Sequence, residues 1–243
     1  MRIELNGLQK IYPESKTGLG SISAVIPPSQ WVSVLGPSGC GKSTLLKLIA
    51  GLEEKTGGSI EQGFTKKEIS FVFQDAALLP WKTVIENITL PLRLRGVSRS
   101  EAEREAQPWL KKLKLEKFAD HFPSQLSGGL KMRVSVARAL ITKPKLILMD
   151  EPFAALDEPI RIELGLELRE LWKALKPTIV FVTHSITEAL WLSDRVMVLQ
   201  GQPGQVALDR ELSFGIDRPL SLRASSDFQK TVEECFQLLR SQS

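Results

Sequence analysis

A short glycine-rich stretch at residues 36–44, GPSGCGKST, combines residue types and spacing that can bind phosphate. It fits the pattern G-x-x-x-x-G-K-[ST], in which successive backbone N–H groups converge on a phosphate because glycines place no side chains in the way. Lys42 is then expected to reach the outer phosphate oxygens, and the Ser43 hydroxyl to bind Mg²⁺. The stretch predicts a site for the phosphates of a nucleotide, lined by Gly36, Pro37, Ser38, Gly39, Cys40, Gly41, Lys42, Ser43 and Thr44.

Cys40 lies inside this positively charged loop, which leaves two interpretations open. Nearby positive charge lowers the pKa of a thiol, so Cys40 could be somewhat reactive. Alternatively, it is only a small residue that fits the loop.

Two adjacent acids end the apolar run in LILMDEP, at residues 146–152. The carboxyl ends of parallel strands point into the ligand crevice of an α/β sheet. We therefore expect Asp150 to reach a Mg²⁺ ion near Ser43, and Glu151 to polarise a water. Alone, the two acids would be read as a cap of the next helix; beside a phosphate loop they indicate nucleotide hydrolysis.

A second glycine pair, in LSGGL at residues 126–130, opens an amphipathic helical pattern after a serine. The free N–H groups and dipole at such a helix start can hold an anion. An ordinary capped helix start is the structural alternative. One nucleotide needs one phosphate cradle, so a second one in the same domain requires an explanation.

Strands and helices of an α/β protein must position these groups. Apolar runs at residues 31–35, 69–74, 145–150, 178–183 and 195–200 predict buried strands, which are typical of a parallel sheet. Helical patterns follow the phosphate loop up to Gly51 and recur at residues 158–175 and 227–239, the last packing on the outside. The runs RIEL and SISAVI add an N-terminal β region, which we expect to be antiparallel.

Residues 75–140 read instead as a helical insertion. TVIE and SRSE offer capping-box starts, and Pro108 should kink the second helix or end it at Gln107. We predict one domain over residues 1–243, with an α/β core at 1–74 and 141–215, the insertion at 75–140 and a helical tail at 216–243.

The composition excludes several classes of protein. A chain of 243 residues with 42% hydrophobic content buries one good core, and a scattered net charge of +4 argues against a nucleic-acid partner. Two cysteines and two histidines form no zinc pattern and suggest a reducing compartment. No apolar run approaches the ~18 to 20 residues that span a bilayer, and the start lacks a secretory signal. We expect a protein that is cytosolic or peripheral to a membrane.

The three motifs together resemble the nucleotide-binding subunit of ATP-binding-cassette transporters, over nearly the whole chain. The resemblance implies a P-loop NTPase core of the RecA-like type and hydrolysis of ATP with Mg²⁺. In that family the signature serine and glycines, here Ser127, Gly128 and Gly129, contact the γ-phosphate of ATP bound to the partner subunit. This would explain the second cradle. Leu130 departs from the usual glutamine and puts in doubt any role at that position.

Further roles follow from the resemblance, one residue at a time. Tyr12 matches the aromatic residue that stacks on adenine, although a surface tyrosine at a strand end is the alternative. Gln74 matches the glutamine that senses Mg²⁺ and the attacking water, or is a polar residue at a strand end. Asp157 resembles the loop that links the two active sites, or caps the next helix. His184 resembles the histidine that binds the γ-phosphate, whereas His121 has no match and is read as structural.

The family mechanism implies a head-to-tail dimer of two copies that encloses two ATP molecules. Its catalytic residues would be Lys42, Gln74, Glu151 and His184, and its Mg²⁺ ligands Ser43, Gln74 and Asp150. The partners would be membrane permease subunits and, indirectly, an extracytoplasmic solute-binding protein, with the chain bound peripherally at the cytoplasmic face of the inner membrane.

The segment LLPW within residues 75–96 falls where the family receives a coupling helix of the membrane subunit. It would expose Leu78, Leu79 and Trp81 as an apolar anchor, or use them to fill the chain's own core; both remain open. LLPW, the signature helix, DEPFAALDE and the tail resemble the importer branch for nitrate, sulfonates, taurine and pyrimidine precursors of thiamine. The solute itself is not readable from this chain.

Other classes remain as alternatives. An exporter of lipids or drugs is the nearest. A chromosome-maintenance ATPase would need a long coiled coil between the motifs, and a ribosome-acting cassette protein usually carries two cassettes. A non-catalytic binding module is disfavoured because Glu151 and His184 are both present.

Overall fold

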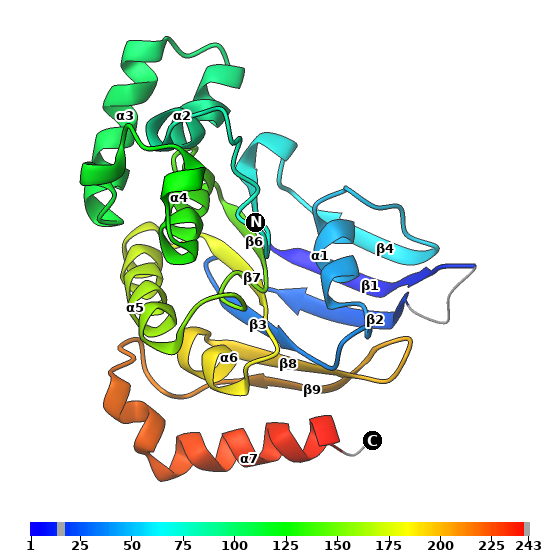
Figure 1. The fold of residues 1–243 in the computed structure, drawn as a ribbon. Helices are drawn as coiled ribbons and strands as arrows, with labels where there is room; N and C mark the ends of the chain where they lie inside the picture. The colour runs from blue at the N-terminus through cyan, green and yellow to red at the C-terminus, as the bar shows by residue number, and fades with distance from the viewer. Residues whose placement is uncertain (14–17, 241–243) are drawn as a thin grey trace.

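A computed structural model describes residues 1–13 and 18–240 and shows two β-sheets with helices between and around them (Figure 1). The larger sheet has the order β5-β6-β7-β3-β8-β9 and is parallel except for β9. Its strands are β3 (Trp31–Leu35), β5 (Ile69–Val72), β6 (Leu146–Asp150), β7 (Thr178–Val182), β8 (Arg195–Gln200) and β9 (Gln205–Glu211). The smaller, antiparallel sheet has the order β2-β1-β4, formed by β1 (Ile3–Ile11), β2 (Gly18–Ile26) and β4 (Gly57–Gln62). The predicted α/β class, with its parallel core and N-terminal antiparallel region, is confirmed.

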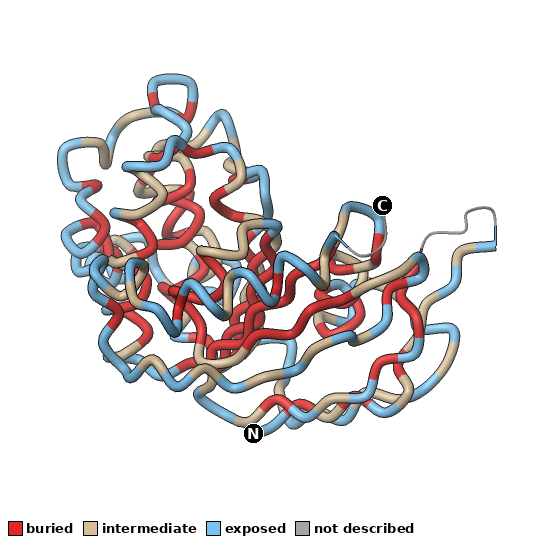
Figure 2. Tube along the Cα trace, turned by 90° about the horizontal axis from the view of Figure 1, so that it is seen from below, coloured by how far each residue is buried: buried red, intermediate tan, exposed pale blue. Residues whose placement is uncertain are grey.

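The central strands are apolar throughout because both faces of the large sheet are covered. Trp31 and Leu35 of β3 join one hydrophobic core, while Val32 and Val34, which point to the opposite face, join a second. The second core also contains helix α1 (Lys42–Ile49), which lies between the two sheets. Figure 2 shows the buried residues concentrated along these central strands.

The first core includes residues of helices α4 (Gly128–Leu140), α5 (Glu158–Leu175), α6 (Ile186–Leu192) and α7 (Ser226–Arg240), together with the helices of the insertion described below. Helix α7 packs on α6 and β8, along the lower edge of Figure 1, and buries Phe228 and Cys235 completely. Among the described residues, no helix is both long and apolar enough to cross a bilayer.

The insertion contains α2 (Val84–Leu94), α3 (Arg99–Lys112) and α4. Thr83 and Glu86 form the predicted capping box of α2, and the Ser98 hydroxyl accepts a hydrogen bond from the N–H of Glu101 at the start of α3. Of the two alternatives for Pro108, an end of α3 at Gln107 is wrong, because the helix continues through Pro108 to Lys112; a kink at the proline stays a prediction.

The physical reason is packing on both sides of the proline. A proline removes one intrahelical hydrogen bond, but Ala106, Trp109 and Leu110 are buried around Pro108 and hold both halves of α3 in place. Two strands were not predicted: β4, which begins with two glycines, and β9, whose residues alternate between exposed and half-buried and include no fully buried one.

Candidate functional site

Three neighbouring strands bring the predicted chemical groups together. Strand β3 pairs with β7, and β7 pairs with β6, all in parallel, so their carboxyl ends meet at one edge of the sheet. The phosphate loop follows β3, the two acids end β6 and His184 follows β7. The Ser43 hydroxyl donates a hydrogen bond to Asp150 Oδ1 at 2.8 Å, as expected for two ligands of one cation.

Lys42 lies within the phosphate loop with its side chain 6% exposed. Its ammonium donates to the carbonyl oxygens of Gly36 and Pro37, at 2.9 and 3.0 Å, and lies 3.9 Å from Glu151 Oε1. An ammonium held among carbonyl oxygens at this loop is placed to exchange them for phosphate oxygens.

Glu151 is bonded to His184 in this structure. Its Oε2 lies 2.8 Å from His184 Nδ1, and its backbone N–H donates to the Val182 carbonyl at 2.9 Å. The φ of Glu151 is +44°, in the left-handed region that non-glycine residues seldom adopt. Such strain collects at functional sites, where the surrounding structure maintains it.

The backbone of the phosphate loop is held by segments that sequence reasoning did not single out. Gly41 has φ +98°, and a Cβ there would lie 2.5 Å from the carbonyl oxygen of Gly18 in β2. The N–H of Gly204, in the turn between β8 and β9, donates to the Cys40 carbonyl at 3.2 Å, and a Cβ on Gly204 would lie 2.1 Å from that oxygen. Gln202 Nε2 donates to the Ser38 carbonyl at 3.0 Å. In the sequence, the feature that could have indicated these contacts was the presence of glycine at positions where two backbone segments approach closely.

Cys40 is fully buried under the loop. Burial raises the pKa of its thiol, and this effect outweighs the opposing charge of Lys42. Of the two interpretations of Cys40, the buried position and the raised pKa agree with a small residue that fits beneath the loop and not with an activated thiol.

Tyr12 is half-buried and lines the same cavity, of about 300 Å³, as Lys42, Ser43 and Glu151. The Lys10 ammonium lies 5.1 Å from the centre of its ring. The structure thus places this aromatic ring beside the phosphate loop, where a base attached to the bound phosphates could stack.

The second glycine pair begins α4. The Ser127 side chain is the N-cap and accepts a hydrogen bond from the Leu130 N–H at 3.4 Å, while Ser127 and Gly128 are exposed. A Cβ on Gly129 would lie 2.7 Å from Ile160 Cγ2, so this glycine is also required for the packing of α4 on α5. Leu130, which replaces the family's glutamine, packs against the hydrophobic core.

Gln74 is exposed after β5 and is not grouped with Ser43. It lines a separate cavity of about 410 Å³ together with Gly128 and Leu156. The adjoining loop is attached to α4 by Arg138, whose guanidinium donates to the carbonyls of Ala76 and Ala77 at 2.7 and 2.8 Å. Burial lowers the pKa of Arg138. Sequence reasoning missed this contact because it joins segments about sixty positions apart.

Asp157 is exposed at the N-terminus of α5, and its side chain makes no capping hydrogen bond. Its carbonyl accepts the N–H of Arg161 at 2.9 Å. The alternative that Asp157 caps the next helix therefore holds for its position, which is the N-cap of α5, but its exposed carboxylate makes no capping hydrogen bond. His121 contacts Phe118 edge-on, and its carbonyl accepts the Val84 N–H, which is a structural arrangement.

The Ser43–Asp150 pair fits Mg²⁺. A hydroxyl and a carboxylate supply the oxygen ligands that this ion prefers, and Mg²⁺ in phosphate sites takes its remaining ligands from water and phosphate. The described residues contain no cluster of three or more His, Cys, Asp or Glu side chains that could hold a metal alone. Burial, reinforced by the neighbouring Glu151, raises the pKa of Asp150, and a nearby cation would offset that cost.

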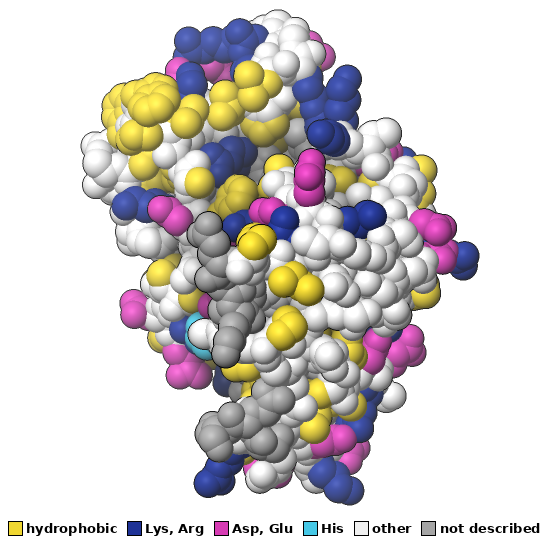
Figure 3. Space-filling view, turned by 90° about the vertical axis from the view of Figure 1, so that its right-hand side faces the viewer, with side chains coloured by type: hydrophobic (Ala, Val, Ile, Leu, Met, Phe, Trp, Pro, Cys, Tyr) yellow, Lys and Arg dark blue, Asp and Glu magenta, His cyan; other side chains and the backbone are white. Residues whose placement is uncertain are grey.

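The LLPW segment precedes α2. Trp81 is 69% exposed, whereas Leu78 and Leu79 are half-buried, so the expectation that all three are exposed holds only for the tryptophan. Figure 3 shows hydrophobic side chains gathered on one face at the height of α2 and α3. Leu94, at the end of α2, is 79% exposed.

Comparison with known proteins agrees with this geometry. A family model described as ABC transporter matches residues 19–154. The chain is 40% identical to the taurine import ATP-binding protein TauB of Rhizobium johnstonii, over 95% of this chain and 92% of that protein. It is 37% identical to the aliphatic sulfonates import ATP-binding protein SsuB of Bacillus cereus, over 98% and 96%.

Among solved structures, the ATP-binding cassette MJ0796, in a dimeric post-hydrolysis state bound to ADP and Pi, superposes with a TM-score of 0.78. The two chains are 33% identical, over 88% of this chain and all of that one. The chain described here belongs to the ABC transporter family and is one of its ATP-hydrolysing subunits.

Proposed function

We propose that the chain drives uptake of a small sulfonate-type solute by hydrolysing ATP in a head-to-tail dimer of two copies. The observation that carries the uptake direction and solute class is the 40% identity with a taurine import ATP-binding protein over 95% of the chain. Nitrate and the pyrimidine precursors of thiamine are the alternative solutes, because the importer branch that the sequence resembles also carries them.

In the proposed reaction, Lys42 binds the β- and γ-phosphates and Tyr12 stacks on adenine. Glu151 orients the attacking water, while His184, which is bonded to Glu151 at 2.8 Å, binds the γ-phosphate. Mg²⁺, held by Ser43, Asp150 and Gln74, would neutralise charge on the phosphates. Gln74 lines a different cavity from Ser43 here, so its part in this set requires that its loop approach the phosphate site.

The proposed dimer explains the second glycine pair. Ser127 and Gly128 are exposed at a helix N-terminus, where free N–H groups favour an anion. The γ-phosphate of the partner's ATP is that anion, and the outward-facing Asp157 lies at the same dimer surface. The superposition on a dimeric cassette supports this arrangement.

The exposed Trp81 would contact a membrane permease, which would hold the chain at the cytoplasmic face of the inner membrane. A solute-binding protein outside the membrane would deliver the solute to that permease. The absence of a membrane-spanning helix among the described residues is compatible with such attachment.

The experiment that tests this proposal uses the solute-binding protein encoded beside this chain. Its thermal unfolding is measured with taurine, alkanesulfonates, nitrate and thiamine-precursor pyrimidines, because a ligand that binds only the folded state raises the melting temperature. We expect one sulfonate-type ligand to raise it selectively. Lack of any such binding protein would contradict uptake and favour an exporter, while leaving ATP hydrolysis intact.

A further inference from the structure

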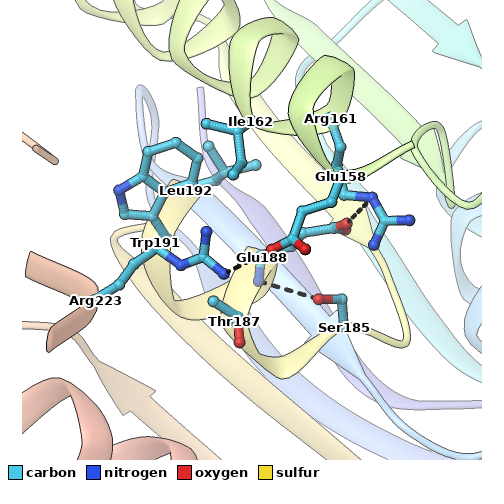
Figure 4. A pocket seen from close by; sticks show the side chains of 9 residues that line it. All are labelled: Glu158, Arg161, Ile162, Ser185, Thr187, Glu188, Trp191, Leu192 and Arg223. Atoms are coloured by element: carbon cyan, nitrogen blue, oxygen red, sulfur yellow. Dashed lines mark hydrogen bonds and ion pairs between the residues drawn. The ribbon is translucent and has the colours of Figure 1, made fainter. Parts of the chain in front are cut away.

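An ion pair between Arg161 and Glu188 connects helices α5 and α6 (Figure 4). Arg161, one turn into α5, places Nε 3.2 Å from Oε1 of Glu188 on α6. The pair lines a cavity of about 380 Å³. The Glu188 side chain is 10% exposed, so its charge is largely removed from water.

Each member of the pair also holds a loop of the site. Arg161 donates through Nη2 to the carbonyl of Leu156 at 2.9 Å, directly before Asp157. Glu188 Oε2 accepts the Thr183 hydroxyl at 2.7 Å, directly before His184, and the same hydroxyl oxygen accepts the Ser185 N–H at 3.0 Å. A continuous path of polar contacts therefore runs from the Asp157 loop to both sides of His184.

Stability alone does not account for this arrangement. Burial raises the pKa of Glu188, which shows that its charge is costly there despite the opposing effect of Arg161. Well-packed apolar residues usually stabilise a protein as well as a buried ion pair does. What the two charged groups add is orientation of the loops, because each makes a charge-assisted hydrogen bond: Arg161 Nη2 to the Leu156 carbonyl, and Glu188 Oε2 from the Thr183 hydroxyl. The contact between the two charges is an ion pair in which Arg161 Nε makes no hydrogen bond.

We infer that Arg161 and Glu188 are positioning residues that couple the Asp157 loop to the His184 loop. Contact of the partner subunit at Asp157 is transmitted through the pair to His184, so that His184 reaches its working position only when the dimer has closed. The inference rests on the proposed roles of Asp157 and His184. It requires no contact between the pair and ATP.

The test measures kcat and KM for ATP in Glu188→Gln, Arg161→Met and the double variant. Glutamine keeps the shape of Glu188 and can still accept from Thr183, but leaves the guanidinium without a carboxylate. Each single variant should lower kcat about tenfold with KM changed less than twofold, because the pair acts on catalysis and not on ATP binding. The double variant should be no slower than either single one, because both remove the same path.

The chain supplies a matched control. Arg195 pairs with Asp209 at 2.6 Å and donates to the Val25 carbonyl, an arrangement of similar burial that holds strands and no site loop. Asp209→Asn should therefore keep kcat within about twofold of the unmodified protein. Melting temperatures of all variants separate loss of fold from loss of coupling.

Three outcomes would overturn the inference: a kcat within twofold of the unmodified protein in Glu188→Gln, an equal loss in Asp209→Asn, or multiplied losses in the double variant. If Glu188→Gln does not fold, Arg161→Lys gives the same test, because lysine keeps the charge but cannot reach both acceptors at once. A separate measurement, the ATP turnover of Glu151→Gln, tests the proposed function itself. Normal turnover in that variant would remove the proposed catalytic roles, whatever Glu188→Gln does.

Discussion

The two regions that we propose to bind phosphate, the loop at residues 36–44 and the start of α4, differ in how they are held. In the phosphate loop, Lys42 contacts carbonyl oxygens and Glu151, and Ser43 is bonded to Asp150, so the groups are oriented by one another. At the start of α4, Ser127 and Gly128 are exposed, and the serine hydroxyl accepts a hydrogen bond from the Leu130 N–H of its own helix. The groups of the phosphate loop are therefore oriented by contacts within the chain, whereas the start of α4 is exposed and available to a ligand or a partner chain.

This difference agrees with the proposal that a single chain is half of a catalytic unit. A preorganised group stabilises a transition state because no energy is spent on orienting it during the reaction. The loop side is organised in this way before the partner arrives. The α4 side supplies only backbone N–H groups, which become useful when a phosphate is brought to them.

The largest effect is expected from Glu151→Gln. The variant should bind ATP but lower kcat by about a thousandfold, because general base or water-orienting groups contribute ~10² to 10⁴ in rate. It should accumulate as an ATP-bound dimer, visible by light scattering. The expected accumulation of a dimer would be contradicted if the variant remained entirely monomeric at high protein concentration with Mg²⁺-free ATP. Glu158→Gln, an exposed glutamate in the first turn of α5, is the control.

Lys42→Ala should instead act on binding. Loss of an ammonium that is 6% exposed and held at the phosphate loop should weaken ATP affinity by about a hundredfold, since charge-assisted hydrogen bonds are worth ~1.5 to 3 kcal/mol each. Titration with a fluorescent ATP analogue measures this. Unchanged affinity would mean that the loop binds phosphate without the lysine.

Gly128→Asp tests the other side of the comparison. A Cβ at this position would lie 3.9 Å from Leu156 Cδ2, which is ordinary contact, and an aspartate at a helix start is favourable for the fold. Single-chain ATP affinity should stay within about threefold, while turnover falls by roughly tenfold or more, because a carboxylate would face the partner's γ-phosphate.

The contrast with Gly129→Ala sharpens this test. There the new Cβ would lie 2.7 Å from Ile160 Cγ2, so the melting temperature should fall as well. Loss of ATP affinity in isolated Gly128→Asp chains would place this region in the same nucleotide site as Lys42 and break the comparison.

The smallest effect concerns Cys40. Because burial raises the pKa of its thiol, iodoacetamide at pH 8 should modify Cys40 more slowly than a free cysteine, by about tenfold. Mass spectrometry of a Cys235→Ser variant measures the rate at this single site. Rapid modification would show that the loop opens far more often than its packing suggests.

The local sequence predicted secondary structure correctly where the outcome depended on backbone conformation or on the capping of one helix end. Helix α5 spans the predicted residues 158–175, and Thr83 and Ser98 begin their helices as predicted. The strand segments that precede the phosphate loop and the two acids were predicted because they are apolar at nearly every position, with Ser33 as an exception, and are followed by glycine or end in acid. Pro108 was misjudged because the packing of α3 outweighs one lost hydrogen bond.

The sequence by itself determined the phosphate loop, the acids after β6 and the helix starts, because glycine freedom, capping and strand periodicity act within a few residues. Only the tertiary structure decided that Ser43 meets Asp150, that Arg138 holds the loop after Gln74 and that Arg161 joins Glu188. These contacts join segments 27 to 107 positions apart along the chain, as the residue numbers show. Their formation depends on strand order and helix packing, which no local pattern encodes.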